Sequence, residues 1–477
     1  MSGYCVHAFI VLCLAGVLLP QAAVAQQQDV AGLNQQAAEL IASGRPLEAE
    51  ILARQAVSAA EGLPNSGKRN LREALLPQAQ QRLGVALRLQ GRSSEAESLL
   101  REALIGADRK HGYSSRLAIK SQINLGLAIQ AQGRYAEADK QLREALERAA
   151  AAKNREALEL DMDARTSLGR LQIHVGNFGE AENLLETVIR QSNDAALQHR
   201  QSVQRWRQMA FDGLAMLRNQ QKRFDDALPY ASSSAELAAP AWGERQGNSM
   251  NAYANLAQSL FKLGQLEEAE IWSRRAVGIA DTLGDEAIGT RSRIYRHLAV
   301  ILDAKGETSA AEAMFNRALA TADARAPAEI ALYTLRAGGD FFSRNGKPEV
   351  ARPLYERAVA LADRLFALSR GLNDAARETK AKRLRPIYGE AILNRVRLDA
   401  KSPGQGHDRA ALADVSRTQS RLFTEMLRTA DVARLAGDDA FVKLKSRRDD
   451  LLLRLDGMQR RLALTARIDD GGETIEP

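Results

Sequence analysis

The side chains that most often carry out catalysis or hold metals are few in this chain and stand far apart. Both cysteines, Cys5 and Cys13, lie within the first 25 residues. The histidines after that segment are His111, His174, His199, His297 and His407. None of them has the HExxH spacing or another metal-ligand spacing. Beyond the first 25 residues a cysteine–histidine pair is excluded, and we predict no catalytic residue, no metal site and no cofactor.

Glycine-rich phosphate loops are also missing from the sequence. Gly404 and Gly406 imitate part of such a loop, but they follow a predicted helix and stand beside Pro403. A phosphate loop needs a strand before it and a helix after it. We therefore interpret Ser402–Gly406 as a linker, and we predict that the protein is not an enzyme.

Positive charge is concentrated near the carboxyl end. The formal net charge is +7, and residues 370–468 carry 22 basic and 13 acidic side chains. Acidic residues are interspersed among the basic ones and aromatic residues make up 5% of the chain. This pattern favours a solvated helix surface with ion pairs over a nucleic-acid interface. A weak contact between the basic stretch near Lys380–Arg385 and anionic lipid head groups stays open.

The amino-terminal segment has the pattern of a secretory signal peptide. Residues 1–25 contain no Asp, Glu, Lys or Arg, and Phe9–Leu19 is apolar throughout. Ala23-Val24-Ala25 provides a small-x-small cleavage site before a run of glutamines. We expect a mature protein that begins at Gln26 and is periplasmic or secreted. A retained membrane anchor is the alternative, although about 11 apolar residues are short for a membrane span.

The rest of the chain is organised by a repeated pattern that is clearest in NLAQSLFKLGQLEEAEIWSRRAV, residues 255–277. An apolar helix with a small residue ends at a glycine turn, and Ala and Glu then open a second helix. The turn positions are Gly44, Gly91, Gly133, Gly176, Lys222, Gly264, Gly306 and Gly346. Their spacing of about 42 residues is typical of helical solenoids. We predict that each turn residue closes a first helix, here called helix A, before a second helix B.

Two sets of small residues make the repeats resemble the tetratricopeptide repeat, in its kinesin-light-chain-like form of about 42 residues. Helix A carries the pairs Leu83-Gly84, Leu125-Gly126, Leu168-Gly169, Leu214-Ala215, Leu256-Ala257 and Leu298-Ala299. Helix B opens with Ala49, Ala96, Ala138, Ala181, Ala227, Ala269, Ala311 and Ala351. The family's early tryptophan and its regular closing proline are missing. The resemblance implies an all-α, right-handed α-solenoid of about eight repeats over residues 26–369.

The pattern changes after residue 370. We predict a basic helix over Ala375–Asp399, which Pro386 should kink or break. Two long helices, Asp408–Ala436 and Asp438–Ile468, then form an antiparallel hairpin with a coiled-coil-like apolar seam. Residues 370–468 are thus the basic helix plus the hairpin, and the acidic tail 469–477 is predicted to be disordered.

Part of this hairpin, Val415–Leu462, resembles the helical segment that joins tetratricopeptide arrays to CHAT domains, which are caspase-like proteases. The resemblance rests on the helical pattern and on an Ala-Gly-Asp turn. It implies an alternative function, in which the chain is a regulatory subunit of a caspase-like protease whose catalytic domain is separate or lost.

The tetratricopeptide resemblance also implies a binding site. In that family the A helices line a concave groove, and an asparagine before the Leu-small pair often contacts the backbone of a bound peptide. Asn124 and Asn255 occupy that position here. Neighbouring groove candidates are Gln81, Arg82, Arg170, Gln258, Lys262, Arg293 and Arg296. We therefore predict an exported, non-enzymatic scaffold for a protein or peptide partner, with ordinary hydrogen bonding between repeats as the alternative role of these residues.

Overall fold

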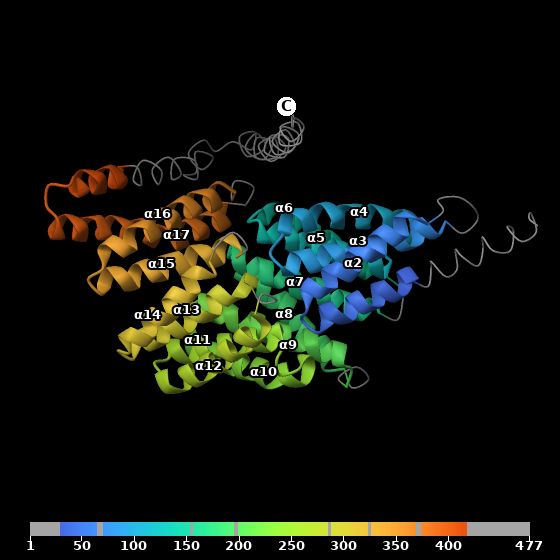
Figure 1. Cartoon of the computed structure of the whole chain (residues 1–477). Coiled ribbons are helices and arrows are strands. Elements are labelled where there is room, and N and C mark those ends of the chain that lie inside the picture. The colour runs from blue at the N-terminus through green and yellow to red at the C-terminus, as the bar shows by residue number, and fades with distance from the viewer. Residues whose placement is uncertain are drawn as a thin grey trace, which may run out of the picture. The chain divides into compact units, whose positions relative to one another are not determined.

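The computed structural model describes residues 29–63, 70–152, 156–194, 199–284, 288–322, 326–368 and 374–416. Within these ranges all regular secondary structure is helical (Figure 1). The expected signal peptide, the tail 469–477 and the hairpin beyond residue 416 lie outside the described residues. The predictions made for those segments, including the CHAT-like resemblance, therefore stay predictions.

Pairs of antiparallel helices follow one another along the chain, as the repeats predict. The first pair consists of a helix over residues 29–42 and α2 (Pro46–Glu61). The next pairs are α3 (Leu71–Leu89) with α4 (Ser93–His111), α5 (Arg116–Ala131) with α6 (Tyr135–Ala151), α7 (Ala157–Val175) with α8 (Phe178–Ser192), and α9 (Gln201–Gln220) with α10 (Phe224–Trp242). They continue as α11 (Gly247–Lys262) with α12 (Leu266–Leu283), α13 (Ile288–Ala304) with α14 (Thr308–Ala320), and α15 (Ala328–Arg344) with α16 (Pro348–Ala367). The described part of the chain thus contains the eight predicted repeats.

Every predicted turn residue adopts the left-handed backbone conformation that ends a helix. The φ angles at the seven glycines lie between 73° and 87°, and Lys222 has φ 60°. The following residue then donates its N–H to a carbonyl five residues back, as in the bond of 2.9 Å from Arg223 to Arg218. These are the bonds of a Schellman motif, which satisfies carbonyls left over at the helix end. The predicted left-handed caps are confirmed.

The small residues lie where helix A crosses helix B at close range. A methyl group placed at Gly84 would come within 2.7 Å of Leu100 Cγ, and one at Gly126 within 2.8 Å of Leu142 Cγ. The alanines that open the B helices, from Ala49 to Ala351, are fully buried. Side chains larger than these would push the paired helices apart, so the crossing explains why the sequence keeps both positions small.

The chain divides into two compact units. The first contains the described residues up to Thr334 except Gly133–Ala136, and the second contains Gly133–Ala136 and the described residues from Leu335 onward. In the first unit the A helices α3, α5, α7, α9, α11 and α13 contact one another in sequence, while each B helix packs against its own A helix. The A helices therefore form one continuous row.

Within the first unit this row curls so strongly that distant repeats touch. His174 Nδ1 on α7 lies 3.5 Å from Glu329 Oε2 on α15, although three A helices stand between them in the chain. A straight row of helices spaced about 10 Å apart would separate the two by roughly 40 Å. A methyl group at Gly44 in the first repeat would likewise lie 2.7 Å from Gln246 Oε1, just before α11. The A helices therefore line the inside of a tight turn.

In the second unit the helix that follows the repeats is longer than predicted. It is α17 (Asp374–Lys401), and it continues through Pro386, so of the predicted kink or break the break does not occur. A proline inside a helix removes one backbone hydrogen bond, and its ring clashes with the carbonyl four residues earlier, here that of Lys382. Leu384 and Ile387, on either side of Pro386, are both buried, which stabilises the two halves as one element.

The loop predicted at residues 402–406 is confirmed, with positive φ angles at Gly404 and Gly406. A helix begins at residue 407, and Arg395 Nε donates to Asp414 Oδ2 at 2.6 Å, which ties it to α17. Lys380 is only 3% exposed, so this member of the basic stretch cannot form part of a lipid-contacting surface.

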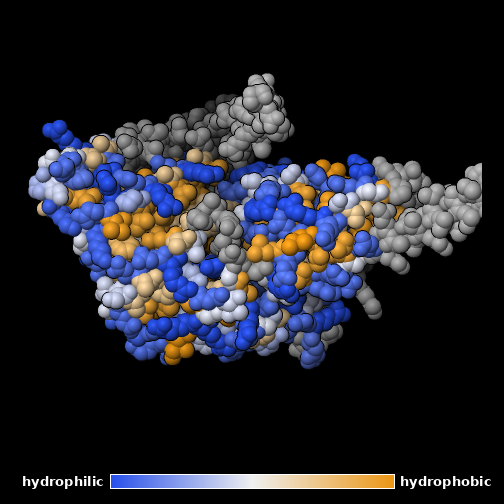
Figure 2. Space-filling view, viewed as in Figure 1, coloured by the Kyte–Doolittle hydropathy of each residue, from blue (hydrophilic) through white to orange (hydrophobic). Residues whose placement is uncertain are grey.

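The outer surface of the described residues is predominantly hydrophilic, with apolar patches scattered between charged side chains on the face seen in Figure 2. Exposed large apolar side chains include Ile51, Ile105, Ile271, Val350 and Leu412. Among the described helices, none combines the length and the apolar character needed to cross a membrane.

Lys222 offers a direct test of the turn geometry. A non-glycine residue in the left-handed region costs about 1–2 kcal/mol, and glycine gives back about 0.5–1 kcal/mol through the freedom of the unfolded chain. Lys222→Gly should therefore raise the free energy of unfolding by up to about 1 kcal/mol, measured by urea denaturation. The matched variant Gly306→Lys, where no neighbouring atom would obstruct a Cβ, should lower it by a similar amount. Equal denaturation midpoints for both variants would contradict this account.

Candidate functional site

A chain of polar contacts runs across the inside of the first unit from α7 to α13. Arg170 Nη1 donates to Asp212 Oδ2 at 2.6 Å, and Asn255 Nδ2 donates to Asp212 Oδ1 at 2.5 Å. Arg293 then donates to Asn255 Oδ1 at 3.2 Å and to Asn251 Oδ1 at 2.5 Å. These five residues, which we call the polar ladder, join the A helices of four consecutive repeats.

The repeat length explains why these side chains meet. Asn251 and Arg293 each stand 13 residues before their turn residue, so they lie at the same height on neighbouring A helices. Asp212 stands ten residues before Lys222, and Asn255 stands nine residues before Gly264. Residues at the same distance from their turn residue form a column across the A helices, so these two lie in adjacent columns of the same face. The Asp212 side chain is 4% exposed. A carboxylate so far from water needs the guanidinium and the amide that contact it.

The ladder carries more positive charge than its carboxylate neutralises. Arg296 lies beside Arg293 on α13, and its Nη1 is buried with no hydrogen-bond partner among the described residues. Burial lowers the pKa of both guanidiniums to about 10, and the repulsion from Arg293 contributes to the lower pKa of Arg296. Arg170 contributes a third guanidinium to the site. Asp212 is the carboxylate of the polar ladder. The site is therefore short of acceptors and of negative charge.

His297 adds a titratable group to this face. Burial holds its pKa well below the usual value, and Arg296, Arg293 and Lys262 lower it further, while a hydrogen bond to the backbone of Ala254 opposes them. The imidazole is therefore neutral near pH 7 and can accept a hydrogen bond. The nearest such contact is from Arg296 Nη2 to His297 Nε2, at 3.4 Å.

The predicted site residues separate into two groups. Arg170, Asn255 and Arg293 belong to the ladder, and Arg296 lies next to it. Gln258 and Lys262 are also on α11. Gln258 is half-buried, and the exposed Lys262 holds its Nζ 5.4 Å from the ring of Phe261.

The other candidates lie on α3 and α5, outside the ladder. Asn124 Nδ2 donates to the carbonyl of Lys120 in its own helix, at 2.7 Å. Gln81 is buried. Arg82 Nε is buried without a partner among the described residues, and burial together with the charge of Arg116 lowers its pKa. The two predicted asparagines thus have different surroundings.

The sequence analysis missed Asp212, Asn251 and His297, which the repeat period could have revealed. Asn251 and His297 occupy the positions that the candidates Arg293 and Asn255 hold in a neighbouring repeat, and Asp212 occupies the position of Gln81 and Arg296 in more distant repeats. It also missed a second contact between A helices, in which Lys120 Nζ donates to Asp163 Oδ2 at 2.5 Å and lies 5.0 Å from the Trp206 ring. Among the described residues, no group of three His, Cys, Asp or Glu side chains is arranged to hold a metal ion.

The geometry defines a class of protein, an α-solenoid of paired helices whose A helices form a polar, cationic inner face. Family models for the tetratricopeptide repeat match residues 75–151, 162–187, 207–282 and 248–324. The helical repeats within these ranges are tetratricopeptide repeats, as their small residues predict.

Similar folds occur among solved structures. The Rap conjugation gene regulator of plasmid pLS20, solved with the Phr* peptide, is 11% identical, with a TM-score of 0.51 and coverage of 72% of this chain and 98% of that one. The apo quorum sensor NprR from B. thuringiensis is 14% identical, with a TM-score of 0.48 and coverage of 69% and 86%. BtubC from P. vanneervenii is 21% identical, with a TM-score of 0.38 and coverage of 49% and 89%. No curated protein matches the sequence.

His297 gives this face a measurable pH dependence. Well above pH 6.5 the imidazole is neutral in both the folded and the unfolded chain, so it adds no pH dependence there. Below that pH the unfolded chain binds a proton that the folded chain does not, because the folded pKa is lower. Stability should then fall as the pH falls, by up to about 2 kcal/mol between pH 7 and pH 5.

The measurement is urea denaturation at both pH values for the wild type, His297→Gln and the control His111→Gln, whose histidine is exposed. His297→Gln should lose this part of the pH dependence, while His111→Gln should keep it. Identical pH dependence in all three proteins would show that His297 titrates alike in the folded and unfolded chains.

Proposed function

We propose that this protein is a non-enzymatic scaffold that holds an extended segment of a partner protein against the inner face of its A helices. The observation that carries the proposal is the polar ladder with its neighbour Arg296. Arg296 Nη1 is buried and has no acceptor within the described structure, and leaving such a donor unpaired costs about 1–3 kcal/mol. Because solvent does not reach this atom, the Arg296 side chain would have to turn outward to donate to an acceptor of the bound segment.

The chemistry of the ladder suits a peptide backbone. An extended backbone offers an N–H and a carbonyl at each residue, and an asparagine amide can bond to both. Guanidiniums and amides on successive A helices repeat along the row, so that they can follow a segment over several residues. The Phr* complex named above belongs to a protein of similar fold. For this chain the choice of a peptide ligand rests on its own inner face.

The two predicted asparagines provide the functional test. The double variant Asn124→Ala, Asn255→Ala should weaken partner binding by roughly tenfold to a hundredfold, since each lost hydrogen bond costs about 0.5–1.5 kcal/mol and distant sites add. The partner would be found by crosslinking in cells, and its affinity measured by titration calorimetry. Asn316→Ala, an exposed asparagine on the B helix α14, is the matched control and should bind normally.

Circular dichroism of the double variant separates binding from folding. Normal binding by a folded double variant would exclude these asparagines from the binding site. Loss of the helical signal would show that they support the repeat itself, which for Asn255 would follow from its contacts with Asp212 and Arg293.

We also propose that the protein acts outside the cytoplasm, because of the apolar segment and the Ala23-Val24-Ala25 motif. The mature chain should begin at Gln26 and should be recovered in the periplasmic or secreted fraction. Amino-terminal sequencing of the protein purified from its own cells tests this. A chain that begins at Met1 or Ser2 and stays with the membrane would contradict it and favour a retained anchor.

A further inference from the structure

Two ion pairs between the B helices of successive repeats occupy the same positions in the repeat numbering. Arg101 stands ten residues after its turn glycine and pairs at 2.6 Å with Glu137, four residues after the next one. Arg143 and Glu180 occupy the same two positions one repeat later and are joined by two bonds of 2.7 and 2.9 Å. In these repeats an arginine on one B helix thus reaches a glutamate on the following B helix.

Other junctions depart from this pattern in other ways, and between α10 and α12 it is the arginine that is missing. The position ten residues after Lys222 is Ser232, while the glutamate four residues after Gly264 is present as Glu268. Glu268 is exposed and has neither a hydrogen bond nor an ion pair among the described residues. The repeat therefore keeps the acceptor and lacks its donor.

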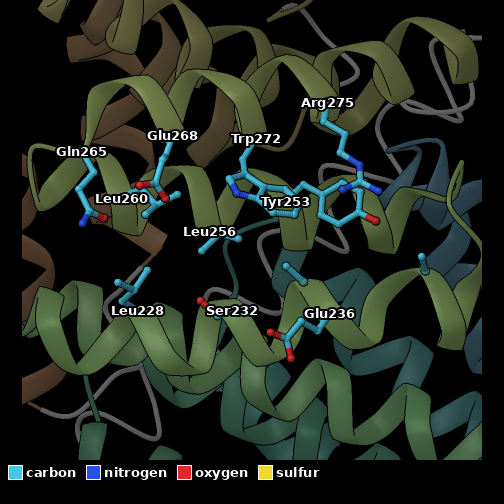
Figure 3. A pocket seen from close by; sticks show the side chains of 12 residues that line it. Leu228, Ser232, Glu236, Tyr253, Leu256, Leu260, Gln265, Glu268, Trp272 and Arg275 are labelled. Carbon is cyan, nitrogen blue, oxygen red and sulfur yellow. The ribbon is translucent and has the colours of Figure 1, made fainter.

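A cavity of about 440 Å³ lies where that arginine would be, between α10 and α12 and in front of α11 (Figure 3). Ser232 and Glu268 both line it, and a second carboxylate, Glu236, faces it from α10. Glu236 also has no hydrogen bond or ion pair within the described part of the chain. The apolar lining of the cavity includes Leu256, Leu260 and Trp272.

Small residues on α10 help to open this cavity. Ala235 lines it and stands 13 residues after its turn residue. The corresponding residues of the three preceding repeats are Leu104, Leu146 and Ile189. A serine in place of an arginine and an alanine in place of a leucine leave room for a side chain that this chain does not supply.

One end of the cavity already shows how a guanidinium is held here. Arg275 lies with its guanidinium carbon 4.4 Å from the ring centre of Tyr253 and 5.2 Å from that of Trp272. Its Nε donates to Glu244 at 2.8 Å, so Arg275 is already paired. It leaves Glu236 and Glu268 available for another cation, and aromatic faces attract such groups.

We propose that this cavity binds an arginine side chain of a partner protein. The guanidinium takes the place of the missing repeat arginine and donates to Glu268, and the aliphatic stem lies against Leu260 and Trp272. The two unpaired carboxylates give the cavity the charge that selects a cation. The site is on the B-helix side of the repeats, so the proposal stands independently of what the A-helix face binds.

The test uses acetyl-arginine amide as the probe and acetyl-citrulline amide, its uncharged isostere, as the control ligand. The full chain is labelled with 5-fluorotryptophan, which reports on its three tryptophans, and Trp272→Phe assigns the resonance of Trp272. The arginine probe should shift the Trp272 resonance in a saturable way, and the citrulline probe should not. Absence of a saturable shift, or equal shifts with both ligands, would overturn the proposal.

Two variants locate the interaction. Ser232→Arg restores the repeat arginine, so the ion pair with Glu268 should form within the chain and weaken binding of the probe by at least about tenfold. Glu268→Gln should weaken it by roughly fivefold or more, whereas Glu267→Gln, an adjacent exposed carboxylate that does not line the cavity, should leave it unchanged. Wild-type affinity in a folded Glu268→Gln protein would exclude the site, even if Ser232→Arg did not fold. Self-association that Ser232→Arg abolishes would show instead that the arginine comes from a second copy of this chain.

Discussion

Each repeat depends on one backbone conformation, the left-handed residue that ends its A helix. This residue reverses the chain within a few residues, so that helix B returns along helix A and the small residues of both meet at the crossing. Glycine adopts the conformation without steric cost. At Lys222 a side chain occupies the same conformation, because the Schellman bond from Arg223 to Arg218 and the packing of α9 against α10 hold the turn in place. The fold therefore requires the left-handed conformation at this position, and glycine adopts it at the lowest steric cost.

The sequence predicted the features that arise within one repeat. A glycine turn, a Leu-small pair and an alanine that opens helix B are all close in the chain, so their spacing alone indicates how two helices meet. At Pro386 the sequence predicted a kink or a break, and the break does not occur, for a related reason. The penalty of a proline inside a helix is local and known, but the burial of Leu384 and Ile387, which offsets it, depends on the tertiary structure. Local sequence rules predicted where the helices lie. They could not predict how far tertiary packing offsets the local cost of a proline.

The inner face was harder to predict, because its contacts depend on which residues the neighbouring repeats place alongside. Asn124 and Asn255 hold the same position in their repeats. Asp212, the partner of Asn255, stands one repeat earlier, ten residues before its turn residue. In the repeat before Asn124 the same position holds Gln81. A buried carboxylate draws the amide of Asn255 across to α9, whereas Asn124 bonds within α5. Reading the sequence by columns across repeats would have identified Asp212, but the curl of the row, which brings His174 to Glu329, has no counterpart in the repeat pattern.

The contact between the first repeat and the start of α11 has a consequence for the order in which the chain is made. Gly44 is followed by about 200 residues before Gln246 is synthesised. At about 5–20 residues per second, the first repeat leaves the ribosome roughly 10–40 seconds before its distant neighbour. Pairing within each repeat needs only nearby residues and proceeds during that interval. This contact consequently forms after the pairing within the early repeats, and until then the inner face stays open to any segment that reaches it first.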